Sequence, residues 1–145
     1  MKIYYFDLNH AISTHDIIIA ESGGLPGTKD EGRLESVLDH LKNDIYYPNF
    51  ERKLSRLVFA LIKFHMFNDG NKRSSISLGA FFLNINGYID RSDVFIDEME
   101  NIVLWVAQGL IEEDFLTDII SSIILYNKLT ETIKLRLTML LINIE

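Results

Sequence analysis

The stretch HMFNDGNKRSS, residues 65–75, is where this sequence is most informative about fold and chemistry. An apolar segment runs into His65, a short polar turn containing Gly70 follows, and a second apolar segment begins after Arg73. This pattern predicts a helix, a loop and a second helix, with the polar side chains gathered in the loop. The first amides of a helix lack partners within the helix, so the start of the second helix is a natural phosphate site.

The residues at the start of that second helix have the properties that a phosphate site requires. Gly70 and Asn71 fall where the free amides are expected, and glycine lets the backbone approach a ligand closely. Lys72 and Arg73 add positive charge beside those amides. An ordinary helix start with two solvated cations is the alternative interpretation. We favour the phosphate site because two reactive side chains stand in the same loop.

Those two side chains are a carboxylate and an imidazole. A carboxylate beside phosphates needs a divalent cation between them, so we expect Asp69 to bind Mg²⁺ together with phosphate oxygens. Asp69 also fits the N-cap of the following helix, and the two roles are compatible. Histidine side chains titrate near neutral pH, which suits His65 as the general base for an attacking hydroxyl. We expect Phe67 to anchor the loop on the core without a chemical role.

Outward from the loop, apolar residues at helical spacing extend along almost the whole chain. The helix before the loop carries Leu57 and Leu61 on its apolar face and should place His65, four residues further on, pointing inward or along the site. Residues 76–85 are apolar nearly all round, which predicts a central helix surrounded by others. The sequence therefore predicts an all-α fold, an irregular helical bundle with the loop at the N-terminus of its central helix.

Capping residues and breakers indicate where the other helices begin and end. We expect Ser13 or Thr14 to cap a short helix, and Asp30 to cap a second one that continues to Ile45. Three apolar segments after the central helix predict further helices, the last capped near Thr130. That last helix would close the core, or pack against a second copy or another protein; the first is commonest for such apolar stripes.

Composition limits the class of protein. The chain has 145 residues, 48% of them hydrophobic, and no cysteine, which suits one domain over residues 1–145 without disulfides. The net charge of −7 argues against direct nucleic-acid binding. The start of the chain lacks an apolar signal core, and no apolar run approaches membrane-spanning length. We therefore expect a cytoplasmic protein that does not bind membranes.

Charge is unevenly distributed along the chain. Residues 51–75 carry six cations and two acids, whereas residues 90–118 are dominated by acids. The basic stretch could attract a nucleotide triphosphate or an acidic partner, although Arg52, Lys53 and Arg56 also fit a solvated basic helix face. The acidic stretch is a possible docking surface or, more simply, a solvated face.

Residues 65–73 resemble the signature H-x-F-x-[D/N/E]-[G/A]-N-[G/K]-R of the Fic/Doc superfamily. The chain looks most like its Doc (death-on-curing) branch, because Lys72 stands where AMP-transferring Fic enzymes carry a second glycine. Met66 also replaces their usual proline, and Ile76 stands where they carry a second arginine. The run GGLPG, residues 23–27, is similar to Doc proteins as well. The resemblance spans about residues 10–125, and residues 126–145 look like an added C-terminal helix.

The resemblance implies a nucleotide-dependent transferase that uses ATP and Mg²⁺. A Doc-like protein would transfer the γ-phosphate of ATP to a threonine or serine of a protein target, with translation elongation factor Tu the expected target, and so stop protein synthesis. Alternatives are a Fic-type AMP transferase and a catalytically silent binding module. In this mapping His65 is the base and Asp69 is the Mg²⁺ ligand. The phosphates are bound by Gly70, Asn71, Lys72 and Arg73. The two cations of this set, Lys72 and Arg73, also take part in catalysis.

The resemblance also bears on regulation and on target binding. The inhibitory pattern [S/T]-x-x-x-E-[G/N] of many Fic proteins is absent from the sequence, and the Doc resemblance implies a separate antitoxin protein that binds the enzyme. Aromatic residues around Asp44–Phe50 could form an exposed flap that aligns a target segment by strand-like pairing. The same aromatics, Tyr46, Tyr47 and Phe50, could instead pack on the core.

Overall fold

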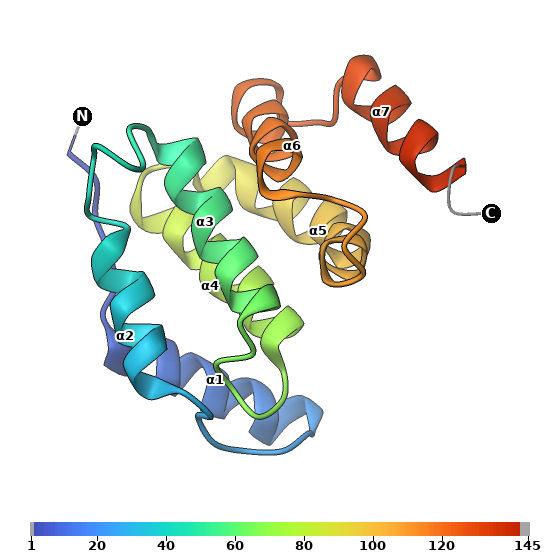
Figure 1. Ribbon diagram of the computed structural model, residues 1–145. Helices are drawn as coiled ribbons and strands as arrows, with labels where there is room; N and C mark the ends of the chain where they lie inside the picture. Colours follow the sequence, from blue (N-terminus) through green and yellow to red (C-terminus); the bar gives the residue numbers. More distant parts are fainter. Residues whose placement is uncertain (1, 143–145) are drawn as a thin grey trace.

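The computed structural model describes residues 2–142, and every regular element in that range is helical (Figure 1). In chain order these are α1 (Leu8–Ser22), α2 (Glu31–His40), α3 (Phe50–Lys63), α4 (Asn71–Ile85), the short 3-10 helix η1 (Ile89–Arg91), α5 (Ser92–Ala107), α6 (Glu113–Tyr126) and α7 (Glu131–Ile142). The all-α prediction is confirmed.

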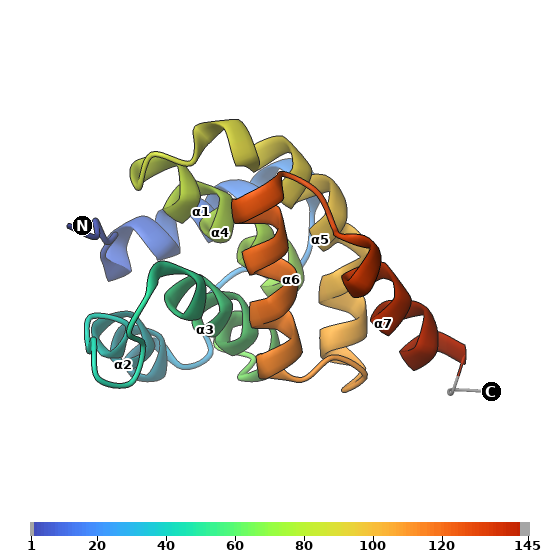
Figure 2. The same ribbon diagram turned by 90° about the horizontal axis from the view of Figure 1, so that it is seen from above.

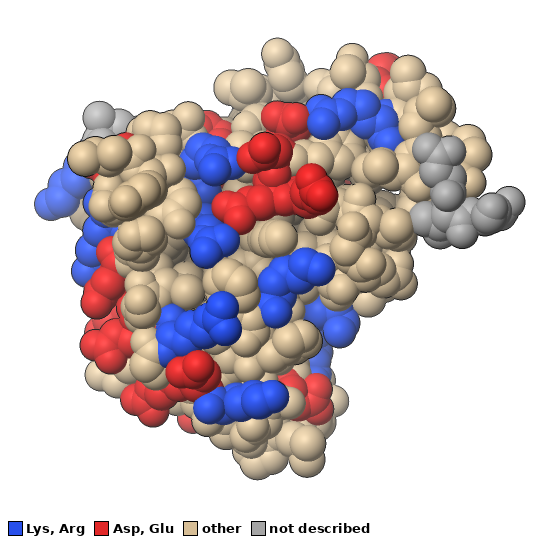
Figure 3. All heavy atoms as spheres, viewed as in Figure 1, with Lys and Arg blue, Asp and Glu red and all other residues tan. Residues whose placement is uncertain are grey.

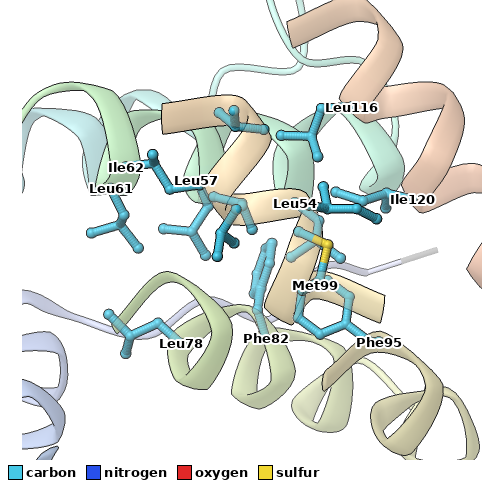
Figure 4. Close-up of a cluster of buried hydrophobic side chains, with 14 of the residues drawn as sticks. Leu54, Leu57, Leu61, Ile62, Leu78, Phe82, Phe95, Met99, Leu116 and Ile120 are labelled. Carbon is cyan, nitrogen blue, oxygen red and sulfur yellow. The ribbon is translucent and has the colours of Figure 1, made fainter. Parts of the chain in front are cut away.

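The central helix is α4, as its all-round apolar sequence predicts. It packs against α1, α3 and α5, while α6 covers the other side of α3. Figure 4 shows Leu54 and Leu57 of α3 meeting Phe82 of α4, with side chains from α5 and α6 closing the cluster. Because α3 and α4 are both fixed along their length by this core, the short loop between them is held at both ends.

Two helix boundaries differ from the sequence prediction. Asp7 caps α1, and its carboxylate accepts from the amide of His10 at 2.9 Å, so the helix begins well before Ser13 and Thr14. Asp30 caps α2 as predicted, accepting from the amide of Arg33 at 3.0 Å. However, α2 ends at His40, which leaves Ile45 outside the helix and 90% exposed. The spacing of apolar residues therefore overestimated the length of α2. Because Ile45 is exposed, no packing against the core holds it at a helical position.

The aromatic segment before α3 does not form a flap at the candidate site. Tyr47 and Phe50 are buried, so they pack on the core, while Tyr46 is exposed. The segment also precedes the N-terminus of α3, whereas the loop of residues 65–70 follows the C-terminus of that helix. A helix of 14 residues is about 20 Å long, which separates the two ends.

The last helix lies at the edge of the molecule (Figure 2). Thr130 accepts from the amide of Ile133, as expected for its cap, and α7 packs on α6 through Ile133 and Leu137, which are buried. The helix therefore helps to close the core, while Leu135 and Met139 on its other face are exposed. Among residues 2–142, none of the helices combines the length and apolar character needed to cross a bilayer.

Candidate functional site

The loop between α3 and α4 is tied to a second, distant segment, residues 23–30 between α1 and α2. The amides of Lys29 and Asp30 both donate to the carbonyl oxygen of Met66, at 2.8 and 3.0 Å. The amide of Asn68 donates to the carbonyl of Gly27, and Thr28 forms an antiparallel bridge with Phe67. Figure 1 shows the two segments together beside the C-terminal end of α1. The glycine-rich run thus forms one wall of the candidate site.

Phe67 and Asn71 hold the loop in place from within. Phe67 is 1% exposed, so its predicted anchoring role is confirmed. The side chain of Asn71 accepts from the Phe67 amide at 3.1 Å and donates to the Phe67 carbonyl at 3.0 Å. These two bonds hold the Asn71 side chain against the Phe67 backbone, while the Asn71 backbone N–H stays at the start of α4.

The loop contains a partner that sequence reasoning missed, the imidazole of His15 on α1. It is completely buried, its ring is stacked on Phe67, and Nε2 lies 2.6 Å from the carbonyl oxygen of Asp69. The sequence does contain one indication that His15 is buried, because it follows the buried Ala11 by one helical turn. That spacing predicts burial but does not reveal a contact with a residue 54 positions away.

The start of α4 presents free backbone amides. Gly70 is its N-cap, in the left-handed region with φ 74°, and no side chain caps the helix. Within residues 2–142 no acceptor is bonded to the amides of Asn71, Lys72 and Arg73. A Cβ at Gly70 would lie 3.2 Å from the Ile19 side chain, so both conformation and space favour glycine. The predicted anion-binding geometry is thus present in the backbone.

Asp69 is not the N-cap of α4, yet its carboxylate is held by two amides. Its Oδ2 accepts from Leu25 at 3.1 Å, and its Oδ1 accepts from Gly70 at 2.8 Å. These two bonds, helped by the charges of Arg73 and Lys72, lower the pKa of Asp69 below its usual value. The two amides therefore favour the ionised carboxylate and hold it in one orientation.

Arg73 lies beside Asp69 because Gly24 has no side chain. A Cβ at Gly24 would be 2.7 Å from Oδ2 of Asp69 and 3.0 Å from Nη2 of Arg73. The other guanidinium nitrogen, Nη1, donates to the carbonyl of Gly23 at 2.8 Å and to the hydroxyl of Ser22. The C-terminal end of α1 thus orients the cation, while Gly24 leaves room for the carboxylate and the guanidinium to converge.

His65 and Lys72 are exposed, and neither side chain forms a hydrogen bond with the described residues. Of the two orientations predicted for His65, inward or along the site, the inward one is wrong: α3 ends at Lys63, and His65 follows its C-cap in a left-handed conformation with φ 47°. That turn carries the imidazole off the apolar face of the helix. Both side chains are therefore free to meet a ligand or a target.

Three of the basic side chains before the loop form ion pairs within the fold and therefore do not form a solvated face. Arg52 and Arg56 pair with Asp114 and Glu113 of α6, at 3.1 and 2.9 Å. Figure 3 shows acidic and basic side chains adjoining where α3 meets α6. The ammonium of Lys53 is buried. It donates to the carbonyl of Leu41 at 2.6 Å and to Asp44 at 2.8 Å.

Burial alone would lower the pKa of Lys53, but the interactions with Asp44 and Tyr5 outweigh it and leave the pKa raised. The charge of Lys53 is therefore retained inside the fold. Part of the acidic stretch is used in the same way, since Asp118 also pairs with Arg136 of α7, at 2.7 Å. Of the six cations in residues 51–75, Lys63, Lys72 and Arg73 are consequently those that form no ion pair with the residues that the structure describes.

Comparison with known proteins identifies relatives over this part of the chain. The model of the Fic/DOC family matches residues 5–83, more than half of the chain. The protein named Protein kinase doc of Escherichia phage P1 is 38% identical over 80 residues, which cover 52% of this chain and 63% of the phage protein. Toxin Doc of Mycolicibacterium smegmatis is 29% identical over 103 residues, 66% of this chain and 79% of that toxin.

Proposed function

This chain belongs to the Fic/DOC family, and on that premise we propose that it transfers the γ-phosphate of ATP to a serine or threonine hydroxyl of a protein target. One relative is named a protein kinase and another a toxin, which supports a Doc-like toxin. We take translation elongation factor Tu as the target and the cytoplasm as the place of reaction. Inhibition of translation would follow, and a separate antitoxin would restrain the enzyme.

The convergence of Asp69 and Arg73 beside Gly24, next to the free amides of α4, is the observation that carries this proposal. Amides at a helix start bind phosphate oxygens, and a guanidinium adds a charged, forked donor. A carboxylate at the same place would repel phosphate unless a divalent cation were bound. Together these groups fit a metal-bound nucleotide better than either a free anion or a bare metal ion.

The donor set also fits Mg²⁺. No group of three or more potential metal-ligating side chains occurs among residues 2–142, so a cage made only of protein ligands is not available there. Magnesium is usually held by one or two carboxylates together with phosphate oxygens and water, and Asp69 supplies one carboxylate. When bound, the metal neutralises charge that develops on the phosphate oxygens.

The chain's own residues then account for the transfer step. The oxygen of the target hydroxyl forms a bond to the γ-phosphorus, and the bond from that phosphorus to the β–γ bridging oxygen breaks, releasing ADP. The imidazole of His65 accepts the hydroxyl proton. Its exposure and lack of hydrogen-bond partners leave a ring nitrogen available for that proton. Arg73 and the amides of α4 orient the phosphates, so that the hydroxyl meets one phosphorus atom only.

Lys72 distinguishes this reaction from AMP transfer. Its side chain is exposed at the start of α4, where AMP-transferring enzymes of the family have glycine. We propose that the lysine fills space and relocates positive charge, so that the γ-phosphorus and not the α-phosphorus faces the hydroxyl. A Lys72→Gly variant that still transferred only the γ-phosphate would contradict this explanation.

The decisive experiment uses purified elongation factor Tu and ATP labelled at either the γ- or the α-phosphate, with Mg²⁺ present. Transfer of the γ-label alone supports the proposed kinase, and its loss in His65→Ala assigns the base. Transfer of the α-label would make the chain an AMP transferase. Absence of both labels, repeated on whole-cell lysate, would contradict the enzyme proposal and leave a catalytically silent binding module.

A further inference from the structure

His15 is completely buried against the loop, although the proposed chemistry does not use it. Its ring lies parallel to that of Phe67, with an interplanar angle of 3° and centroids 4.0 Å apart. Its Nε2 is 2.6 Å from the carbonyl oxygen of Asp69 and would be 3.5 Å from a Cβ on Gly70. A single side chain of α1 therefore contacts two residues of the loop, Phe67 and Asp69, and would also crowd a side chain at position 70.

The chemistry of the bond fixes the tautomer of His15. A carbonyl oxygen can only accept, so Nε2 must carry the hydrogen and donate it to Asp69. The other ring nitrogen, Nδ1, is buried and has no hydrogen-bond partner within the described chain. A buried polar atom without a partner is destabilising, and phenylalanine at this position would avoid it. The hydrogen bond to Asp69 is thus the contribution that only the imidazole makes.

That hydrogen bond determines the orientation of a whole peptide group. The C=O and N–H of a trans peptide point in opposite directions, and residues 2–142 contain no cis peptide. By holding the Asp69 carbonyl toward α1, His15 directs the Gly70 N–H away from α1. The carboxylate of Asp69 accepts that N–H at 2.8 Å. The Gly70 residue that follows takes up the left-handed conformation from which α4 begins.

From this geometry we propose that His15 is a positioning residue, which fixes the Asp69–Gly70 peptide and through it the Asp69 carboxylate and the free amides of α4. It lies behind the loop and acts only through these groups. The effect of His15 on ligand binding rests on the proposed function, whereas the control that His15 has over the peptide orientation does not. The two parts can therefore be tested separately.

Three variants isolate the hydrogen bond. His15→Phe keeps an aromatic ring on Phe67 and removes the donor. His15→Gln places its side-chain NH₂ the same number of bonds from the backbone as Nε2, and so restores a donor. The matched control is His10→Phe. His10 also lies on α1 and stacks on an aromatic ring, that of Phe81 at 4.0 Å, but within residues 2–142 its side chain is hydrogen-bonded only to Thr14 of its own helix.

The first measurement is the affinity for ATP with and without Mg²⁺, by titration calorimetry. Groups that orient a metal ligand typically change metal affinity by 10- to 100-fold, so the gain in ATP affinity from Mg²⁺ should fall at least ~10-fold in His15→Phe. His15→Gln should recover most of that gain, and His10→Phe should match the wild type. An equal gain in His15→Phe and His10→Phe would overturn the proposal.

The second measurement needs no nucleotide and follows hydrogen exchange of single amides by NMR. Without the bond from His15, the amides of Gly70 and Leu25 should exchange roughly 5- to 10-fold faster, while those inside α5 should not change. His15→Gln should restore slow exchange. If the wild type did not bind Mg²⁺ and ATP, the proposed function would fail, and exchange would still decide the role of His15. Unchanged exchange in His15→Phe would overturn that role.

Discussion

Met66 and Phe67 are shielded almost completely from solvent, whereas His65 and Lys72, from the same loop, are exposed. The buried side is tied to the fold by aromatic stacking and by backbone hydrogen bonds from Lys29 and Asp30. On the exposed side, the side chains of His65 and Lys72 form no hydrogen bond with residues 2–142. One stretch of sequence thus has a fixed side and a free side.

The difference explains how a short loop can be both rigid and reactive. The buried side fixes the backbone, so that the amides of α4 and the carboxylate of Asp69 are already oriented before a ligand arrives. Preorganised groups of this kind lose little freedom when they bind. The exposed side chains can then move without disturbing the loop. Changes on the buried side should therefore affect stability and function together, and changes on the exposed side function alone.

The largest effect is expected for Phe67→Ala. Removing a buried phenylalanine typically costs about 3–5 kcal/mol in unfolding free energy, and here it also removes the stacking partner of His15. Denaturant unfolding measures the first effect, and ATP binding under conditions where the variant is folded measures the second. Phe82→Ala is the matched control, because Phe82 is also 1% exposed but lies on α4, in the hydrophobic core. It should cost similar stability and retain ATP binding; equal binding by both variants would contradict the positioning role of Phe67.

The next effect, on rate alone, is expected for His65→Ala. Loss of a general base typically lowers the rate by at least ~100-fold, while removal of an exposed side chain without partners should leave the unfolding free energy within about 0.5 kcal/mol. Transfer of labelled phosphate and denaturant unfolding measure the two quantities on one preparation. His40→Ala is the control for the rate: His40 is exposed at the C-terminal end of α2, where its ring contacts Tyr46 and Tyr47, and its loss should leave the rate unchanged. A wild-type rate for His65→Ala would remove the base from the mechanism.

A smaller effect on both quantities is expected for Asn71→Ala, which removes both hydrogen bonds to the Phe67 backbone. Leaving such groups without partners should cost about 1–3 kcal/mol of unfolding free energy and weaken ATP binding. Asn68→Ala is the control, since among the described residues the exposed side chain of Asn68 is hydrogen-bonded only to the Pro26 carbonyl, and its loss should cost less than about 0.5 kcal/mol of unfolding free energy. If the two variants lost equal stability, the division into a fixed and a free side would not hold.

The two sides also differ in how far the sequence reveals them. His65, Asp69 and Arg73 were chosen as candidate site residues because they lie in one contiguous signature, and that choice stays a prediction; periodicity identified α4 as the central helix. The contact between His15 and Asp69 joins residues 54 positions apart, and spacing along one helix cannot specify such a pair. The ion pairs of Arg52 and Arg56 with α6 were missed for the same reason. The loop and the central helix were thus predictable, and the long-range contacts that orient the loop were not.

The smallest effect concerns the pH dependence of stability contributed by Asp69, which lies between the two sides. The amides of Leu25 and Gly70 lower its pKa from the usual value of 3.8, so the folded state favours the ionised carboxylate. A lowered pKa contributes stability that is complete above the unfolded value and is lost as the pH falls through the folded value. The difference in unfolding free energy between wild type and Asp69→Asn should therefore be constant from about pH 5 to 7 and shrink below pH 3.8. Denaturant unfolding between pH 3 and pH 7 measures it. If the difference did not change with pH, the amides of Leu25 and Gly70 would bind the neutral asparagine as strongly as the carboxylate. The fixed side of the loop would then orient Asp69 without stabilising its charge.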